Sequence, residues 1–274
     1  MLKQTFFRPM VPQKDYSELE ADLNLDEIES IDLAWRAEQS LISTKIAGIP
    51  TFVGDGVCVT RLKDVSINKH LLSSGVSPYA PVYDATRRAV HAESANNYRY
   101  PLGYSWSTKV PDRYSFFPNP KSGLPFLFIF RGEWSVVPTA TAQVLYNSQD
   151  GTTGVFFGFD PNTSSTDLLF IIRSAGVGTQ YIVQVVMDTD PHTWTIYSDG
   201  STITFEQDGI IVDTAAVGAT TIQPEDITAT FLGWRIGSYY PAKDFYWYGV
   251  AIKNGAATAE ERAFWRSWVE NIPE

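Results

Sequence analysis

Residues 192–209 have the sequence HTWTIYSDGSTITFEQDG, in which polar and apolar residues alternate on both sides of an Asp-Gly pair. A second pair, Asp208-Gly209, ends the stretch and is followed by the apolar run that begins at Ile210. Asp-Gly is favoured in tight hairpin turns, because both residues tolerate the positive φ angles that such turns need. The stretch therefore predicts three antiparallel strands in succession.

Similar short runs continue in both directions from this stretch. Each run is apolar or alternating and is bounded by turn-forming residues such as Gly, Asp, Asn or Pro. The runs cover residues 124–130, 142–146, 154–159, 168–173, 180–187, 229–236 and 245–252. No strand–helix–strand alternation separates them, so a parallel sheet is not expected. The series predicts an all-β fold, a two-sheet antiparallel jelly-roll sandwich.

A short helix is predicted at the C-terminal end. Thr258-Ala-Glu-Glu261 has the spacing of a capping box, in which the Thr and Glu side chains satisfy each other's backbone N–H groups. Aromatic residues follow at helical spacing, as in Phe264 and Trp268. We expect this helix to pack its aromatic face on the sandwich.

The first part of the chain has a different pattern. From Asp15 to Glu38, apolar residues recur every three to five positions in an acidic sequence, which predicts an amphipathic helix. Residues 73–81, SSGVSPYAP, predict a linker. We therefore expect an N-terminal arm over residues 1–79, with an acidic helix, short strands and a linker, and a β-sandwich over residues 80–274. The helix either packs on its own chain or docks the chain to a larger assembly.

Composition excludes several classes of partner. The chain has 274 residues and a net charge of −10, so it lacks the basic surface that nucleic acid or an anionic membrane attracts. Cys58 is the only cysteine, which excludes an internal disulfide. The first residues lack the apolar core of a signal peptide, and no run approaches the roughly 18 apolar residues of a membrane span. We expect a chain made in a reducing cytoplasm.

Three stretches, taken in order, resemble the concanavalin A-like (laminin G-like) jelly-roll superfamily. The first is PVYDATRRAVHA at residues 81–92, and the second is the hairpin stretch at 192–209. The third joins LGWRIG at 232–237 to FYWYGVAI at 245–252 and the terminal helix. The resemblance covers residues 80 to 274 and implies a lectin-like fold. Chains with such a domain behind an unrelated N-terminal arm look similar to virion proteins of tailed bacteriophages.

The resemblance implies binding rather than catalysis. The superfamily includes glucanases, but their Glu-x-Asp-x-x-Glu strand motif, which supplies a carboxylate pair, is not found in this sequence. We expect a non-enzymatic virion protein, in a tail, a fibre or a capsid decoration, that forms a homo-oligomer. Its partner would be a cell-surface glycan or a neighbouring virion protein. The alternatives are a glycoside hydrolase or lyase of the jelly-roll class and a non-viral carbohydrate-binding module.

Aromatic residues are the candidates for glycan binding, because a ring offers a flat apolar face with polar groups beside it. The candidate residues are Tyr104, Trp106, Tyr239, Tyr240 and Trp247. Alternation places Phe245 and Trp247 on one face of their strand and Tyr246 and Tyr248 on the other. One of these two faces must belong to the core.

No cofactor is expected, and calcium is the one metal that the sequence allows. Oxygen-rich turns suit this ion, and the candidate ligands are Asp160, Asn162, Asp188 and Asp190. None of the three histidines lies at metal-ligand spacing from another. His192, two residues before Trp194, is interpreted as a hydrogen-bonding residue at the start of a strand.

Overall fold

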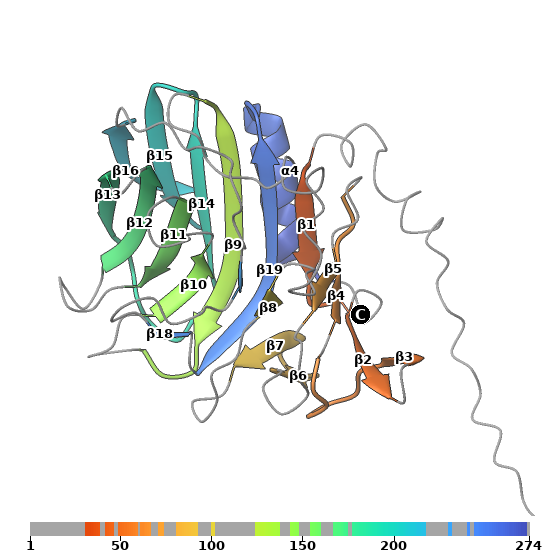
Figure 1. Cartoon of the computed structure of the whole chain (residues 1–274). Helices are drawn as coiled ribbons and strands as arrows, with labels where there is room; N and C mark the ends of the chain where they lie inside the picture. Colours follow the sequence, from red (N-terminus) through yellow and green to blue (C-terminus); the bar gives the residue numbers. More distant parts are fainter. Residues whose placement is uncertain are drawn as a thin grey trace, which may run out of the picture.

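The computed structural model shows a mostly antiparallel β-protein with one C-terminal helix (Figure 1). It describes residues 31–38, 42–46, 49–59, 61–66, 71–73, 81–92, 100–101, 124–137, 143–147, 154–159, 167–174, 177–217, 230–231, 240–241 and 244–272. The strands belong to three sheets of eight, seven and four strands.

The eight-stranded sheet has the order β16-β15-β14-β9-β19-β7-β6, and β1 also pairs with β19. Its strands are β1 (Leu33–Arg36), β6 (Val82–Asp84), β7 (Ala89–Ala92), β9 (Phe126–Trp134), β14 (His192–Ser198), β15 (Thr202–Gln207), β16 (Ile210–Ala216) and β19 (Phe245–Asn254). The two-residue turn Asp208-Gly209 joins β15 to β16, and both residues have positive φ angles, 53° and 79°. The predicted hairpin is therefore confirmed.

The seven-stranded sheet has the order β13-β12-β11-β10-β17-β8, with β18 running parallel to β10. Its strands are β8 (Tyr100–Pro101), β10 (Gln143–Asn147), β11 (Gly154–Phe159), β12 (Asp167–Ser174), β13 (Val177–Gln184), β17 (Thr230–Phe231) and β18 (Tyr240–Pro241). The four-stranded sheet, β3-β2-β4-β5, consists of β2 (Ile42–Ile46), β3 (Ile49–Phe52), β4 (Arg61–Lys63) and β5 (Leu71–Ser73). Most of the strands predicted after residue 124 are confirmed with small shifts of their ends.

Aromatic side chains connect the two larger sheets. Phe128 and Phe130 of β9 lie on one face of their strand, as their spacing of two requires. Their ring centroids are 5.1 Å and 5.5 Å from that of Phe157 in β11. Tyr181 of β13 lies 5.9 Å from Phe205 of β15. These contacts place one hydrophobic core between the sheets.

The helix α4 (Ala259–Glu270) packs on β9 and β19, on the side away from the seven-stranded sheet (Figure 1). The predicted capping box is confirmed. The Glu261 N–H donates to the Thr258 hydroxyl at 3.2 Å, and the Thr258 N–H donates to the Glu261 carboxylate at 2.8 Å. Trp265, Trp268 and Val269 are buried, so the aromatic face of the helix packs as expected.

Residues 33–36 form a strand, and the helix predicted from Asp15 to Glu38 is wrong over this part. β1 pairs antiparallel with β19, with Trp35 opposite Val250. The loose apolar spacing that predicted a helix also occurs in a strand buried on both faces, and all four residues of β1 are buried. The earlier part of the predicted helix lies outside the described residues.

The described residues of the expected arm (residues 1–79) belong to the same hydrophobic core as the rest of the chain. Val53, Val59, Leu62 and Val65 are buried in the same hydrophobic cluster as β9 and β19. The boundary near residue 80 stays a prediction. No helix among the described residues is long and apolar enough to cross a membrane.

Candidate binding surfaces

The structure shows which face of residues 245–248 belongs to the core. Phe245 and Trp247 are fully buried. The Phe245 ring lies 4.8 Å from that of Trp134, and the Trp247 ring stacks at 5.8 Å from that of Phe130. The prediction that Trp247 stacks on a sugar is therefore wrong, because its ring fills the interior.

Tyr246 and Tyr248 point away from this core, yet their residues are only 7% and 8% exposed. The guanidinium of Arg87 lies 4.4 Å from the ring centre of Tyr246, and that of Arg131 lies 5.5 Å from Tyr248. His91 stacks on Tyr246 at 4.1 Å. The rings are thus covered by neighbouring side chains, and neither offers a sugar an open face.

Glu133 joins these groups into a neutralised cluster. Its buried carboxylate accepts a hydrogen bond from the Arg87 side chain at 2.7 Å, and its charge acts on the nearby Tyr248 hydroxyl. Burial and the nearby Glu133 charge together raise the pKa of Tyr248 above its usual value. Because Glu133 already compensates Arg87, we assign this cluster a structural role on the outer face of the sheet.

The remaining glycan candidates stay predictions. Tyr104, Trp106 and Tyr239 lie outside the described residues, and only the backbone of Tyr240 is described, in β18. Among residues whose burial is described, the large exposed apolar side chains are all aliphatic, with no Trp, Tyr or Phe. No Trp, Tyr or Phe among the residues whose burial is described is therefore a largely exposed platform for a sugar.

Of the calcium candidates that are described, Asp188 has other partners for its carboxylate. Asp188 Oδ1 accepts a hydrogen bond from the Asp190 N–H at 2.8 Å and lies 3.0 Å from His192 Nε2. Asp160 and Asn162 lie outside the described residues. Within the described part of the chain, no group of three or more His, Cys, Asp or Glu side chains is placed to hold a metal ion.

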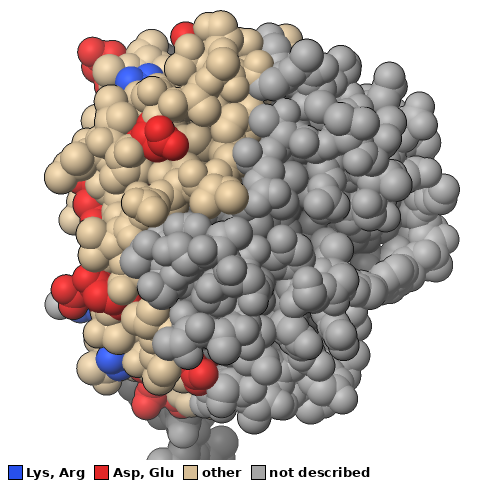
Figure 2. All heavy atoms as spheres, turned by 90° about the vertical axis from the view of Figure 1, so that its left-hand side faces the viewer, with Lys and Arg blue, Asp and Glu red and all other residues tan. Residues whose placement is uncertain are grey.

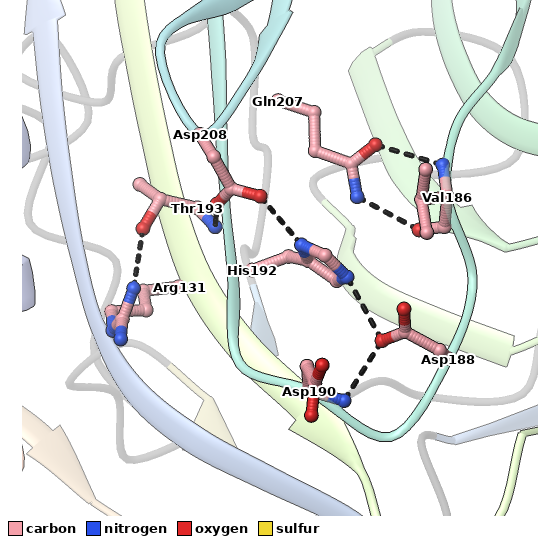
Figure 3. A network of polar contacts seen from close by, with 8 residues as sticks. All are labelled: Arg131, Val186, Asp188, Asp190, His192, Thr193, Gln207 and Asp208. Atoms are coloured by element: carbon pink, nitrogen blue, oxygen red, sulfur yellow. Dashed lines mark hydrogen bonds and ion pairs between the residues drawn. The ribbon is translucent and has the colours of Figure 1, made fainter.

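His192 lies between two carboxylates at the start of β14 (Figure 3). Its Nδ1 is 2.6 Å from Asp208 Oδ2, and its Nε2 contacts Asp188. The hydrogen bond to Asp208 raises the pKa of His192 and outweighs its burial. Burial acts to raise the pKa of Asp208, but bonds from His192 and from the Thr193 N–H lower it overall. The strand-start role predicted for His192 is confirmed.

Gln207 makes a second connection beside this network (Figure 3). Its side-chain amide donates to the Val186 carbonyl and accepts from the Val186 N–H, both at 2.8 Å. The amide thus makes the same two hydrogen bonds that a backbone unit of a neighbouring strand would make. It links β15 to the segment that follows β13. Tyr181 of β13 also donates to the Ala216 carbonyl of β16 at 3.5 Å. The edges of the two larger sheets meet at these contacts.

Exposed aliphatic side chains lie on β16 and on or just after β13, two strands that contact each other. In β16, Ile210, Ile211 and Val212 are 71%, 57% and 38% exposed. Ile182 and Val186, on and just after β13, are 43% and 59% exposed. We call these five residues the β16 edge, because β16 ends its sheet and pairs only with β15 among the described strands. The sequence predicted β16 as a strand but did not show that it lies at the edge of its sheet.

Acidic side chains lie around the β16 edge, together with Arg266, whose guanidinium lies beside Gly209 at the start of β16. The sequence contains no lysine or arginine between Ser174 and Trp234. Its exposed carboxylates in the described part include Asp190, Asp208 and Asp213. Figure 2 shows this side of the molecule, whose described surface is mostly uncharged, with several acidic groups and few basic ones.

No protein-family model and no curated protein matches the chain. Solved structures with a similar fold include the receptor-binding domain of botulinum neurotoxin D, with a TM-score of 0.58 and 10% identity over 88% of this chain and 54% of that one. The binding domain of botulinum neurotoxin DC in complex with SialylT has a TM-score of 0.51, and the same domain in complex with rat synaptotagmin II has 0.52. Each shares 10% identity over 88% of this chain and 52% of that one. The chain thus spans about half the length of these domains, and the likeness is one of fold.

Proposed function

We propose that this chain is a non-enzymatic structural protein of a bacteriophage virion, in a tail, a fibre or a capsid decoration, that binds a neighbouring protein. The β16 edge is the observation that supports binding to a protein. Exposed aliphatic side chains on two adjoining strands favour an interaction surface, since water contact with apolar area is unfavourable.

The chemistry of this surface favours a protein over a glycan. A sugar site needs convergent polar groups beside an aromatic face. The β16 edge instead presents exposed Ile and Val side chains, which suit the apolar surface of another protein. A glycan partner would depend on Tyr104, Trp106, Tyr239 and Tyr240.

The fold gives further support. Its likeness to toxin binding domains, one of them solved with rat synaptotagmin II, fits a chain that acts through a surface. We take the two larger sheets to be a concanavalin A-like jelly roll. The expected N-terminal arm, residues 1–79, would place the chain in a homo-oligomer or on a particle.

Sedimentation of particles tests this proposal. Particles from a lysate of the source culture are separated on a density gradient, and fractions are probed with an antibody against the chain. We expect the chain in the particle band, and mild zero-length cross-linking to join it to a particle protein. A chain that stays at the top of the gradient would contradict a virion role. Binding on a glycan array without any protein cross-link would favour the glycan alternative.

A further inference from the structure

We propose that His192 is a proton-operated latch for the loop of residues 188–191, which is closed while the imidazole is charged and opens when the ring loses its proton. The latch joins Asp188 of this loop to Asp208 of the turn between β15 and β16 (Figure 3). It does not depend on the proposed function, because it concerns how one loop is held rather than what the chain binds.

Both ring nitrogens of His192 face carboxylate oxygens. Nδ1 lies 2.6 Å from Asp208 Oδ2, and Nε2 lies 3.0 Å from Asp188 Oδ1. Both nitrogens carry a hydrogen only in the imidazolium, whereas the neutral ring has one N–H group and one bare lone pair. The arrangement with two donated hydrogen bonds is therefore that of the charged ring. When the ring is neutral, one of the two carboxylates must face a lone pair.

Asp208 is the carboxylate that stays in place. Its Oδ1 accepts a hydrogen bond from the Thr193 N–H at 2.8 Å, and its own N–H donates to the Thr193 carbonyl at 2.8 Å. These bonds hold Asp208 against β14 whatever the charge of the ring. We therefore expect the neutral ring to keep its hydrogen on Nδ1. The bare Nε2 then faces Asp188 Oδ1, and these two acceptors repel each other.

The loop that carries Asp188 is placed to move. The Asp188 side chain is 45% exposed, and residues 189–191 are exposed. The chain before the loop is held by groups that do not titrate. The Gln207 amide bonds both backbone groups of Val186 at 2.8 Å, and Met187 packs against the hydrophobic core. The opening should therefore be confined to residues 188–191.

Charged groups surround the latch, and the two partner carboxylates favour its closed form. The hydrogen bond to Asp208 raises the pKa of His192 above the ordinary value of about 6.5. Arg131 donates to the Thr193 hydroxyl at 2.8 Å, and its charge favours the ionised form of Asp208. The other charged groups on the adjoining elements are Asp190 in the loop, and Arg266, which lies beside Gly209 and 3.8 Å from Glu206.

The direction of the switch follows from the raised pKa of His192. The latch is complete below about pH 6.5 and is lost as the pH rises through the folded-state pKa of the ring. Opening removes one positive charge and leaves Asp188 without its cation. The turn at Asp208 leads directly into β16, so this change of charge and shape occurs next to the β16 edge.

Methyl NMR on the full chain measures the opening. The Thr189 methyl group reports on the loop, and the Met187 methyl group reports on the packed segment before it. We expect the Thr189 methyl to lose order between pH 5.5 and pH 9. The open form should gain roughly tenfold in relative population, because a hydrogen bond to a charged group is lost. The Met187 methyl should keep its order, and the midpoint should coincide with the titration of the His192 ring.

Three variants locate the controlling group. His192→Gln removes the titrating ring, so the order of the Thr189 methyl should be equal at the two pH values. Asp188→Asn supplies an amide that can accept from the charged ring or donate to the neutral ring, so the pH step should also vanish. Asp190→Asn is the matched control. It removes the same charge from the same loop, but Asp190 contacts Asp188 through its backbone N–H, so the step should remain.

Several results would overturn the latch. One is a Thr189 methyl with the same order at pH 5.5 and pH 9. Another is a pH step that persists in His192→Gln or Asp188→Asn, because a different group would then control the loop. A step lost in Asp190→Asn would assign the effect to the charge of the loop as a whole. Loss of order at Met187 together with Thr189 would show general loosening. Partner binding enters none of these measurements, so the proposed function stands or falls separately.

Discussion

The indole rings of Trp35 and Trp247 lie 4.3 Å apart and tie β1 to the core of the eight-stranded sheet. Both side chains are fully buried, although they are more than 200 positions apart in sequence. Through Trp35, β1 thus belongs to the same hydrophobic core as β19.

Removing Trp35 is expected to destabilise the whole domain. Trp35→Ala should lower the free energy of unfolding by about 3–5 kcal/mol, the usual cost of emptying a large aromatic site. Urea unfolding followed by circular dichroism measures this change.

A truncation series gives the control. A chain that starts at Ile31 keeps β1 and should retain its melting temperature, whereas one that starts at Ala80 loses β1 and should aggregate or melt far lower. If the chain from Ala80 were as stable as the full chain, β1 would not be part of the core. This comparison also tests the boundary predicted at residue 80.

Arg36 is the one charged residue of β1, and its replacement should destabilise the fold. Its guanidinium donates to the carbonyls of Trp268 and Asn271 at the C-terminal end of α4, at 3.0 Å and 3.2 Å. It also forms a buried ion pair with Glu38 at 2.9 Å. Arg36→Met removes the ion pair from the buried Glu38 carboxylate and removes the positive charge from the helix end. We expect a loss of about 3 kcal/mol or more in unfolding free energy.

The double variant Arg36→Met/Glu38→Met separates these two effects. It also removes the buried Glu38 carboxylate, so it should recover part of the stability lost in Arg36→Met. The unfolding free energy that the double variant does not recover measures the hydrogen bonds from Arg36 to the end of α4. A double variant no more stable than the single one would assign the whole effect to α4. Guanidinium unfolding of the unchanged chain, Arg36→Met, Glu38→Met and the double variant completes the cycle.

The strands could be predicted because they carry local signals. The turn Asp208-Gly209 needs positive φ at two positions, and the capping box at Thr258 satisfies its own backbone groups. Such signals depend on neighbours in sequence. β1 was missed because nothing local distinguishes residues 33–36 from a helical turn, and its strand geometry depends on β19, which lies far along the chain.

The binding surface was predicted less well than the fold. Alternation separated Trp247 from Tyr246 and Tyr248, but which face is core depends on what packs there. In the same way, the run from Ile210 to Val212 predicted a strand without showing that it ends a sheet. Consecutive aliphatic residues after a tight turn, with no lysine nearby, are the signal that could have indicated an edge.

Gly209 provides a test of the turn beside that edge. Its φ angle is +79°, and an added Cβ would lie 2.2 Å from Nη1 of Arg266. Gly56 also has a positive φ, +67°, but an added Cβ there would meet no atom within 4 Å. Gly56→Ala should therefore cost about 1 kcal/mol from backbone strain alone. Gly209→Ala should cost more, because Arg266 must also leave its position near Glu206.

The added cost is expected to vanish when Arg266 is truncated. In an Arg266→Ala background, Gly209→Ala and Gly56→Ala should lower the melting temperature by similar amounts. An unchanged difference between them would show that the guanidinium moves aside without cost. Differential scanning calorimetry resolves shifts of this size.

The His192–Asp208 pair should make stability depend on pH over a defined range. The pKa of His192 is raised, so its contribution is complete below the ordinary histidine value of about 6.5 and is lost as pH rises through its folded pKa. The pKa of Asp208 is lowered, so its contribution is complete above about 4 and is lost as pH falls through its folded pKa. The pair therefore stabilises the fold most between about pH 4 and 6.5.

His192→Gln should accordingly cost more stability at pH 5.5 than at pH 9, as measured by urea unfolding. Asp199→Asn is the matched control, since Asp199 also lies in a hairpin turn and its pKa is also lowered, but by bonds from Thr202 and Ser201. Its effect should be the same at both pH values, because no histidine takes part. An equal loss for His192→Gln at the two pH values would mean that the imidazole acts through its shape and neutral hydrogen bonds rather than through its charge. Titration of the His192 ring by NMR would then show a pKa at or below the ordinary value, in conflict with the two flanking carboxylates.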